Sequence, residues 1–177
     1  MATTKWIADP THSEISFKIR HLMITNVTGY FRKFSVELET QNDDFDSVTK
    51  VIFIADINSI DTANEARDNH LKSADFFNEA EFPHIKFIGN HLQKTGAEGK
   101  LNGDLTIRDV TRPVVLDIEY GGIVSDGYGQ TKAGFTLRSK VSRKEFGLTW
   151  NATTETGGIV AGDEIKITGE IQLIKTP

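Results

Sequence analysis

The feature that most restricts the fold of this chain is an alternation of apolar and polar residues with a period of two. In the first such run, Ile15, Phe17 and Ile19 alternate with charged or hydroxyl-bearing residues. Successive side chains of a β-strand point to opposite faces, so this pattern is typical of a strand with one buried face. Seven further runs share it: Tyr30 with Phe34, Val36 and Leu38; Val51, Phe53, Ala55 and Ile57; Ile85 and Phe87; Leu101, Leu105 and Ile107; Val114, Leu116, Ile118 and Tyr120; Ala133, Phe135, Leu137 and Val141; Ile165, Ile167, Ile171 and Leu173. The chain is therefore predicted to be all-β.

Turn-forming residues separate these runs, at Asn42-Asp43-Asp44, Gly121-Gly122, Asp126-Gly127 and Gly157-Gly158. About eight antiparallel strands in one small chain indicate a barrel or a sandwich. Gly99, Gly103 and Gly169 share the parity of inward-facing residues and favour the barrel, because glycine in a strand often marks a bend or a close approach. Such glycines fit strong curvature with room for a guest molecule, or they relieve crowding between side chains. The residues leave both interpretations open.

One segment, residues 61–73 (DTANEARDNHLKS), lacks the alternation. Thr62 and Glu65 stand at capping-box spacing, which predicts a short helix. A second helical turn is expected from Ser73 and ends before Pro83, and a short turn at His21–Thr25 joins the first two strands. The predicted architecture is a single domain, residues 1–177, built as an antiparallel barrel of about eight strands with a short helical insertion over an opening.

Composition excludes several classes of function. The net charge of −5, without clusters of lysine or arginine, argues against nucleic-acid binding. The absence of cysteine excludes disulfides and thiolate catalysis. The five histidines show no H-x-H, H-x-x-x-H or H-E-x-x-H spacing, so we expect no metal and no cofactor. His12 and Ser13 are neighbours on a strand and point to opposite faces, and no G-x-S-x-G motif is present, so the sequence predicts no enzyme.

No apolar run approaches the ~18 residues of a membrane span, so stable membrane insertion is not expected. No apolar run of about 7–15 residues follows a basic start either. As written, the sequence predicts a cytoplasmic protein, or a periplasmic or secreted one whose signal peptide has been removed.

The eleven phenylalanines bear on how the interior of the barrel is used. Phe76, Phe77 and Phe82 follow the helical insertion, and others occupy inward positions of the strands. A barrel of about eight strands either fills with side chains or holds one small ligand. The rings therefore form a core or the wall of an apolar site. The segment 61–82, correspondingly, is interpreted as a movable lid or as a static plug.

Four ordered blocks of the sequence carry a family resemblance. They are Asp9, His12, Ser13, Ile15, Phe17, Ile19 and His21, with Gly29 and Phe31; HLKSADFFNEAEFPHIKF, from His70 to Phe87; GDLTIRDVTRPVVLD, from Gly103 to Asp117; and Arg143, Phe146 and Gly147. In this order they resemble the YceI-like family over nearly the whole chain. Asp109 departs from the pattern, since the family often has glycine there, but aspartate tolerates the left-handed geometry of a turn better than most residues.

The resemblance implies a lipocalin-like barrel that binds, carries or sequesters a polyisoprenoid or fatty amphiphile without enzymatic chemistry, and it also implies a homodimer. The expected ligand-binding residues are Phe17, Ile19, His21, Phe34, Phe53, Asn69, His70, Phe76, Phe77, Phe87, Leu105, Ile107, Phe135 and Arg143. An anionic or hydroxyl head group is expected to accept hydrogen bonds from the polar residues of this set and from Arg32. These candidates are His21, Arg32, Asn69, His70 and Arg143. The alternatives are that Arg32 is a plain strand residue and that Arg143 caps a turn. At the level of function, the alternatives are a lipid-modifying enzyme using His12, His21 or His70, and an interaction module with a filled core.

Overall fold

The computed structural model describes residues 2–151 and 161–177. In chain order the elements are β1 (Thr3–Ala8), β2 (Glu14–His21), β3 (Thr25–Phe31), β4 (Phe34–Gln41), β5 (Asp44–Asp56), η1 (Ile57–Ser59), β6 (Ile60–Asp61), α1 (Glu65–Lys72), β7 (His84–Thr95), β8 (Glu98–Ile107), β9 (Val110–Ser125), β10 (Thr131–Ser142), η2 (Arg143–Phe146) and β11 (Ala161–Lys175). The alternating runs of the sequence lie on these strands, which confirms the all-β prediction. None of the helices in the described ranges is long and apolar enough to cross a membrane.

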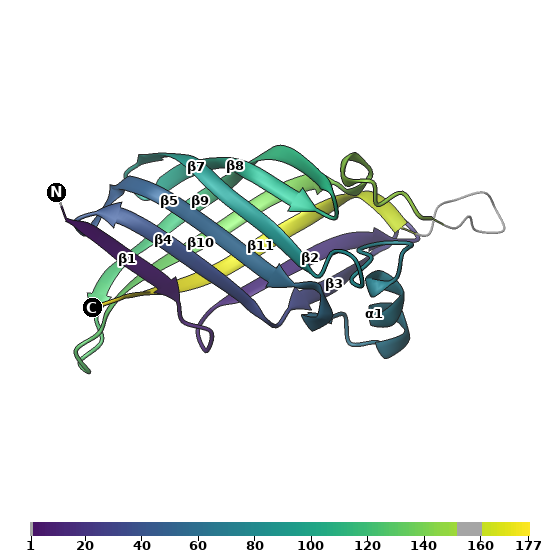
Figure 1. Cartoon of the computed structure of the whole chain (residues 1–177), viewed down its shortest axis with the longest axis horizontal. Helices are drawn as coiled ribbons and strands as arrows, with labels where there is room; N and C mark the ends of the chain where they lie inside the picture. The colour runs from purple at the N-terminus through teal and green to yellow at the C-terminus, as the bar shows by residue number, and fades with distance from the viewer. Residues whose placement is uncertain (1, 152–160) are drawn as a thin grey trace.

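The strands form a closed antiparallel barrel (Figure 1). β1 and β2 pair with successive parts of β11, so together they make one interrupted strand. β3 with β4, and β5 with β6, are interrupted in the same way, because β3 pairs with β2 and β6 while β4 pairs with β1 and β5. Counted with these interruptions, eight consecutive strands go up and down around the barrel, and β11 closes it against β1 and β2. The predicted barrel of about eight strands is confirmed.

A short polar turn interrupts the first strand between β1 and β2. The buried Asp9 carboxylate accepts hydrogen bonds from the backbone N–H of Thr11 (3.0 Å) and from its hydroxyl (2.7 Å). The other Asp9 oxygen lies 2.8 Å from Nδ1 of His12. These bonds satisfy the backbone where the ladder stops, and the alternation resumes at Ile15.

The inward glycines make room for the barrel's own side chains. A Cβ on Gly169 would lie 2.8 Å from Cδ1 of Ile15 and 2.7 Å from Cγ of Leu137. A Cβ on Gly103 would lie 2.7 Å from Cε2 of Phe87. Of the two interpretations left open by the sequence, these contacts favour relief of crowding at Gly103 and Gly169.

One turn prediction is wrong, and another falls on residues that the structure does not describe. Gly121-Gly122 lies inside β9, where Gly122 opposes Gly134 and Tyr120 opposes Phe135, so that Gly121 is the extra residue of a β-bulge. Gly122 has a φ of 115°, which residues with a Cβ rarely adopt. Gly157-Gly158 lies outside the described residues. The turns at Asn42-Asp43 and Asp126-Gly127 are present.

The helical insertion forms, but its cap differs from the prediction. Asn64, rather than Thr62, is the N-cap of α1, and its side chain accepts from the backbone N–H of Arg67 (3.0 Å). Thr62 instead donates its backbone N–H to Asp68 (2.8 Å). The expected second helical turn is a series of hydrogen-bonded turns, in which Phe77 N donates to Leu71 O. The turn at His21–Thr25 forms, with Ile24 N donating to His21 O.

The two ends of the barrel differ. Near the chain termini, four aromatic rings fill the interior: the ring centroids of Trp6 and Phe45 lie 4.8 Å apart, those of Phe45 and Phe135 5.1 Å, and those of Tyr120 and Phe135 5.0 Å. We call this group, Trp6, Phe45, Tyr120 and Phe135, the aromatic plug. α1 and the β2–β3 turn lie at the opposite end (Figure 1).

Candidate functional site: an apolar cavity under the helical insertion

A cavity of about 370 Å³ lies inside the barrel at the end that carries α1. Its wall is almost entirely apolar. The lining residues are Ile15, Ser16, Phe17, Ile19, Arg20, His21, Val27, Phe31, Val36, Val51, Phe53, Thr62, Arg67, His70, Leu71, Phe76, Phe77, Ile85, Phe87, Leu101, Leu105, Ile107, Val114, Leu116, Leu137, Val141, Arg143, Leu148, Trp150, Ala161, Ile165, Ile167 and Ile171. Its volume falls in the range of ~300–1,000 Å³ that is usual for small-molecule sites.

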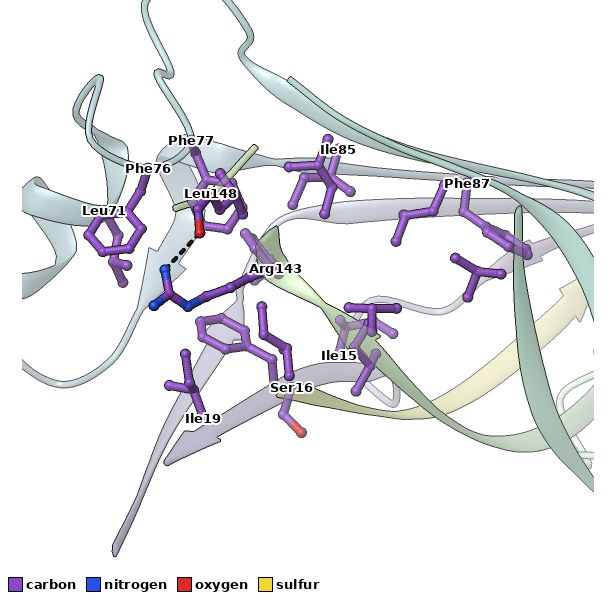
Figure 2. Close-up of a pocket in the computed structure, with 18 of the residues that line it drawn as sticks. Ile15, Ser16, Ile19, Leu71, Phe76, Phe77, Ile85, Phe87, Arg143 and Leu148 are labelled. Atoms are coloured by element: carbon purple, nitrogen blue, oxygen red, sulfur yellow. Dashed lines mark hydrogen bonds between the residues drawn. The ribbon is translucent and has the colours of Figure 1, made fainter. Parts of the chain in front are cut away.

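The alternation of the strands produces this wall directly. Phe17 and Ile19 of β2, and Leu105 and Ile107 of β8, are apolar members of alternating runs, and all four line the cavity. Figure 2 shows Leu71 and Phe76 at one end of the lined space and Phe87 at the other. Because the inward faces of the barrel strands converge, side chains distant in sequence surround one apolar volume.

The segment that follows α1 closes over the cavity mouth. α1 itself has no buried residue, whereas Phe76 and Phe77 are buried and line the cavity. The Phe76 ring lies 5.3 Å from the Trp150 ring, and the Phe77 ring lies 6.1 Å from the Phe31 ring. The insertion therefore touches the barrel mainly through apolar side chains at the end of its helix and just after it.

Arg143 is buried in the cavity wall and binds the backbone. Its Nη1 donates to the carbonyls of Leu148 (2.7 Å) and Trp150 (2.7 Å), its Nε to that of Gly162 (2.8 Å), and its Nη2 to that of Ala161 (3.3 Å). Figure 2 shows the guanidinium beside Leu148. Burial lowers the pKa of Arg143. Four of its five N–H groups thus hold two backbone segments together, and this arrangement favours the alternative that Arg143 caps a turn over the head-group role.

Three further polar side chains of the wall, those of His70, Arg67 and His21, lie at the mouth. His70 places Nε2 2.9 Å from Oδ2 of Asp75, and its ring stands edge-on to Trp150 with 4.6 Å between centroids. Arg67 donates from Nε to the hydroxyl of Thr62 (2.8 Å). His21 is exposed at the end of β2. These groups give the rim of the mouth hydrogen-bonding capacity that the inner wall lacks.

Three of the expected ligand-binding residues lie away from the cavity wall. Phe135 belongs to the aromatic plug at the other end of the barrel. Phe34 packs on Phe53 with 5.8 Å between ring centroids, and Asn69 is exposed on α1. Alternation indicates which face a residue occupies but not its depth along the barrel, so Phe34 and Phe135 could not be distinguished from true wall residues. The expected residues that do line the wall are Phe17, Ile19, His21, Phe53, His70, Phe76, Phe77, Phe87, Leu105, Ile107 and Arg143.

Arg32 also lies off the cavity. Its Nε is 3.1 Å from Oδ2 of Asp61, and its guanidinium stacks 4.2 Å from the centroid of the Tyr30 ring. Arg32 is exposed, as the alternative interpretation expected, but it lies in the bend between β3 and β4 rather than within a strand. Conversely, the cavity wall includes Arg67, Leu148 and Trp150, which stand outside any alternating run and therefore give no periodic signal in the sequence.

The histidines named for the enzyme alternative do not form one cluster. His12 bonds Asp9 in the turn between β1 and β2, while His21 and His70 lie at the cavity. Within the described ranges, no group of three or more histidine, aspartate or glutamate side chains is placed to hold a metal ion.

Comparisons with known proteins agree with this geometry. A profile of the YceI-like domain matches residues 6–173. A UPF0312 protein of Staphylococcus aureus (strain USA300) is 37% identical over 164 residues, which cover 92% of this chain and 93% of that protein. The crystal structure of the Campylobacter jejuni YCEI protein has a TM-score of 0.77 and 33% identity, covering 90% of this chain and 91% of that chain. A polyisoprenoid binding domain from Saccharophagus degradans shares the fold, with a TM-score of 0.65 and 12% identity over 97% of this chain and 98% of that domain.

Proposed function

The chain belongs to the YceI-like family, and from that premise we propose that its barrel binds and carries or sequesters a long-chain apolar amphiphile, such as a polyisoprenoid or a fatty lipid, without chemical conversion. The observation that carries the proposal is the apolar cavity of about 370 Å³ under the α1 end of the barrel. An apolar wall with polar groups at the rim fits a molecule with a long tail and a small head.

Burial of the tail supplies the affinity. Each methylene taken out of water contributes about 0.8 kcal/mol, so ten buried carbons contribute about 8 kcal/mol before the cost of association is subtracted. This contribution depends on length and hardly on chemical detail. We therefore expect affinity to rise with tail length until the cavity is full.

The head group is assigned to the rim. The polar residues His21, His70 and Arg67 lie at the mouth, and the apolar inner wall contacts the tail. The aromatic contacts of His70 with Phe76 and Trp150 fix its ring at the boundary between the two regions. Selection among amphiphiles then takes place where polar donors are available.

The test is native mass spectrometry of gently purified protein, combined with a matched pair of variants on β9. Val114 lines the cavity, whereas Val115, the next residue, is 47% exposed on the outer wall. Val114→Phe fills part of the cavity and is expected to lower binding of a prenyl alcohol at least tenfold, while Val115→Phe leaves it unchanged.

Equal binding by both variants, or purified protein that neither retains nor takes up any lipid, would remove the carrier function. A change in the mass of the bound lipid during incubation would instead favour the enzyme.

A further inference from the structure

The turn between β2 and β3 exposes three apolar side chains at the rim of the cavity. Leu22 is 40% exposed, Met23 50% and Ile24 71%. They follow His21, which lines the cavity. A cluster of solvent-exposed apolar residues beside the mouth of a binding cavity is typical of a surface that contacts a membrane or another protein.

The backbone of this turn adopts a conformation that is unusual for apolar residues. Leu22 has a φ of 52° and Met23 a φ of 61°, in the left-handed region where hairpin turns usually place asparagine or glycine. Arg20 supports the turn by donating from Nη2 to Met23 O (3.0 Å). Stability alone would favour small polar residues at these positions, so the apolar tip needs another reason.

A row of three lysines crosses the outer wall close to this turn. Lys18 on β2 lies directly opposite Lys166 on β11, which in turn lies opposite Lys140 on β10. All three are exposed and point outward, because their neighbours along each strand face the interior. None forms an ion pair with any residue in the described ranges. Like charges in directly opposed positions destabilise a sheet, so this row also works against stability.

The charge around the row is positive, although the chain carries a net charge of −5. Arg20 lies on the mouth side of the row, on the same strand as Lys18. The nearest acidic residues on β11 are Asp163 and Glu164, and Asp163 is engaged with the hydroxyl of Ser142 (2.6 Å). Four cations against two carboxylates leave a basic patch below an apolar tip.

We infer that the β2–β3 turn and the lysine row form a docking surface for an anionic lipid bilayer. Leu22, Met23 and Ile24 would enter the interface between head groups and acyl chains, while the lysines meet anionic head groups. Lys18 and Leu22 are four residue steps apart along the chain, about 13 Å at the usual rise of a strand, and a lysine side chain can span much of that distance. An acidic protein would use the lysines but would give the apolar tip no partner, so the bilayer explains both features. Docking here brings the cavity mouth to the membrane.

The test is sedimentation of the full chain with vesicles of phosphatidylcholine alone or of phosphatidylcholine with 40% phosphatidylglycerol. We expect binding to the anionic vesicles, weaker at high salt, and little binding to the neutral ones. Each lysine near an anionic surface contributes roughly fivefold to affinity, so Lys18→Gln with Lys166→Gln is expected to reduce binding about 25-fold. Met23→Gly with Ile24→Ser is expected to reduce it by a similar factor. Both pairs remove unfavourable features of the fold, so the variants are expected to fold at least as well as the parent.

Matched controls lie elsewhere on the barrel. Lys86→Gln removes an exposed lysine of β7, and Val124→Ser removes a side chain that is 63% exposed at the opposite end. Neither is expected to change vesicle binding. Docking is measured whether or not the cavity holds a lipid, so failure here is distinct from failure of the carrier function. Equal binding to neutral vesicles, an unchanged affinity in both double variants, or binding of polyglutamate but not of vesicles would overturn the proposal.

Discussion

At the scale of single residues, Arg143 shows that a buried cation in a ligand cavity can serve the backbone. The residue is 1% exposed, and its guanidinium donates to the carbonyls of Leu148, Trp150, Ala161 and Gly162. Removing the donor would leave buried carbonyls without partners, at about 1–3 kcal/mol each and not additively. We expect Arg143→Ala to lower the free energy of unfolding by about 3–5 kcal/mol in a urea titration.

Arg32→Ala is the matched control, since Arg32 is exposed and lies off the cavity. We expect it to change stability by about 0–1 kcal/mol, as is usual for a surface ion pair. A stable Arg143→Ala protein with much weaker, less salt-dependent lipid binding would restore the head-group role.

Asp9 gives a prediction about pH. Hydrogen bonds from His12 and Thr11 lower the pKa of this carboxyl to about 2 from an ordinary value of 3.8. Because the pKa is lower in the folded protein than in the unfolded chain, the ionised carboxylate stabilises the fold above about pH 4, and this contribution disappears as the pH falls from about 4 to 2. We expect Asp9→Asn to cost about 1–2 kcal/mol at pH 7 and to differ little from the parent near pH 2.

The measurement is the free energy of unfolding from urea titrations at several pH values. Asp104→Asn, which replaces an aspartate on the exposed face of β8, serves as the matched control for the substitution itself. A constant difference between Asp9→Asn and the parent across this range would contradict the assignment.

At the scale of elements, the sequence predicts faces better than boundaries. The period of two placed Phe17, Leu105 and Ile167 on the inner face correctly, because register ties every residue of a strand to one side. It could not show that β1 and β2 are one interrupted strand, since the interruption depends on hydrogen bonds within the turn at Asp9. It also could not identify the bulge at Gly121, because a pair of glycines is equally typical of a hairpin turn.

The segment from Asp61 to Phe82 is an element whose motion can be measured. α1 buries none of its residues, and the segment contacts the barrel mainly through Leu71, Phe76 and Phe77. Few buried contacts predict a low free energy of local opening. We expect backbone amides of α1 to exchange hydrogen faster than those of β8 in lipid-free protein, and to slow when lipid is added. Protection of α1 equal to that of β8 in lipid-free protein would instead show that the segment 61–82 closes the mouth without moving.

At the scale of the whole molecule, the barrel divides into a filled end and a hollow end. The aromatic plug occupies the end near the termini, and the cavity occupies the end beneath α1. The members of the plug come from β1, β5, β9 and β10, and they meet because the strands are staggered around the barrel. Stagger is not visible in a pattern of alternation. For this reason the sequence left open whether the interior was filled or hollow. The interior is filled at the end near the termini and hollow at the end beneath α1.

This division predicts that stability and ligand binding separate along the barrel. Phe135 packs against Phe45 and Tyr120 in the aromatic plug, so Phe135→Ala is expected to cost about 3–5 kcal/mol in unfolding free energy while leaving lipid affinity nearly unchanged. Phe77 faces the cavity, so the space left by Phe77→Ala joins one that already exists. We expect that variant to lose less stability but to bind lipid several-fold more weakly. Urea titration and a lipid-binding assay on both variants make the comparison. Equal effects of the two substitutions on both measurements would show that the interior behaves as one continuous core.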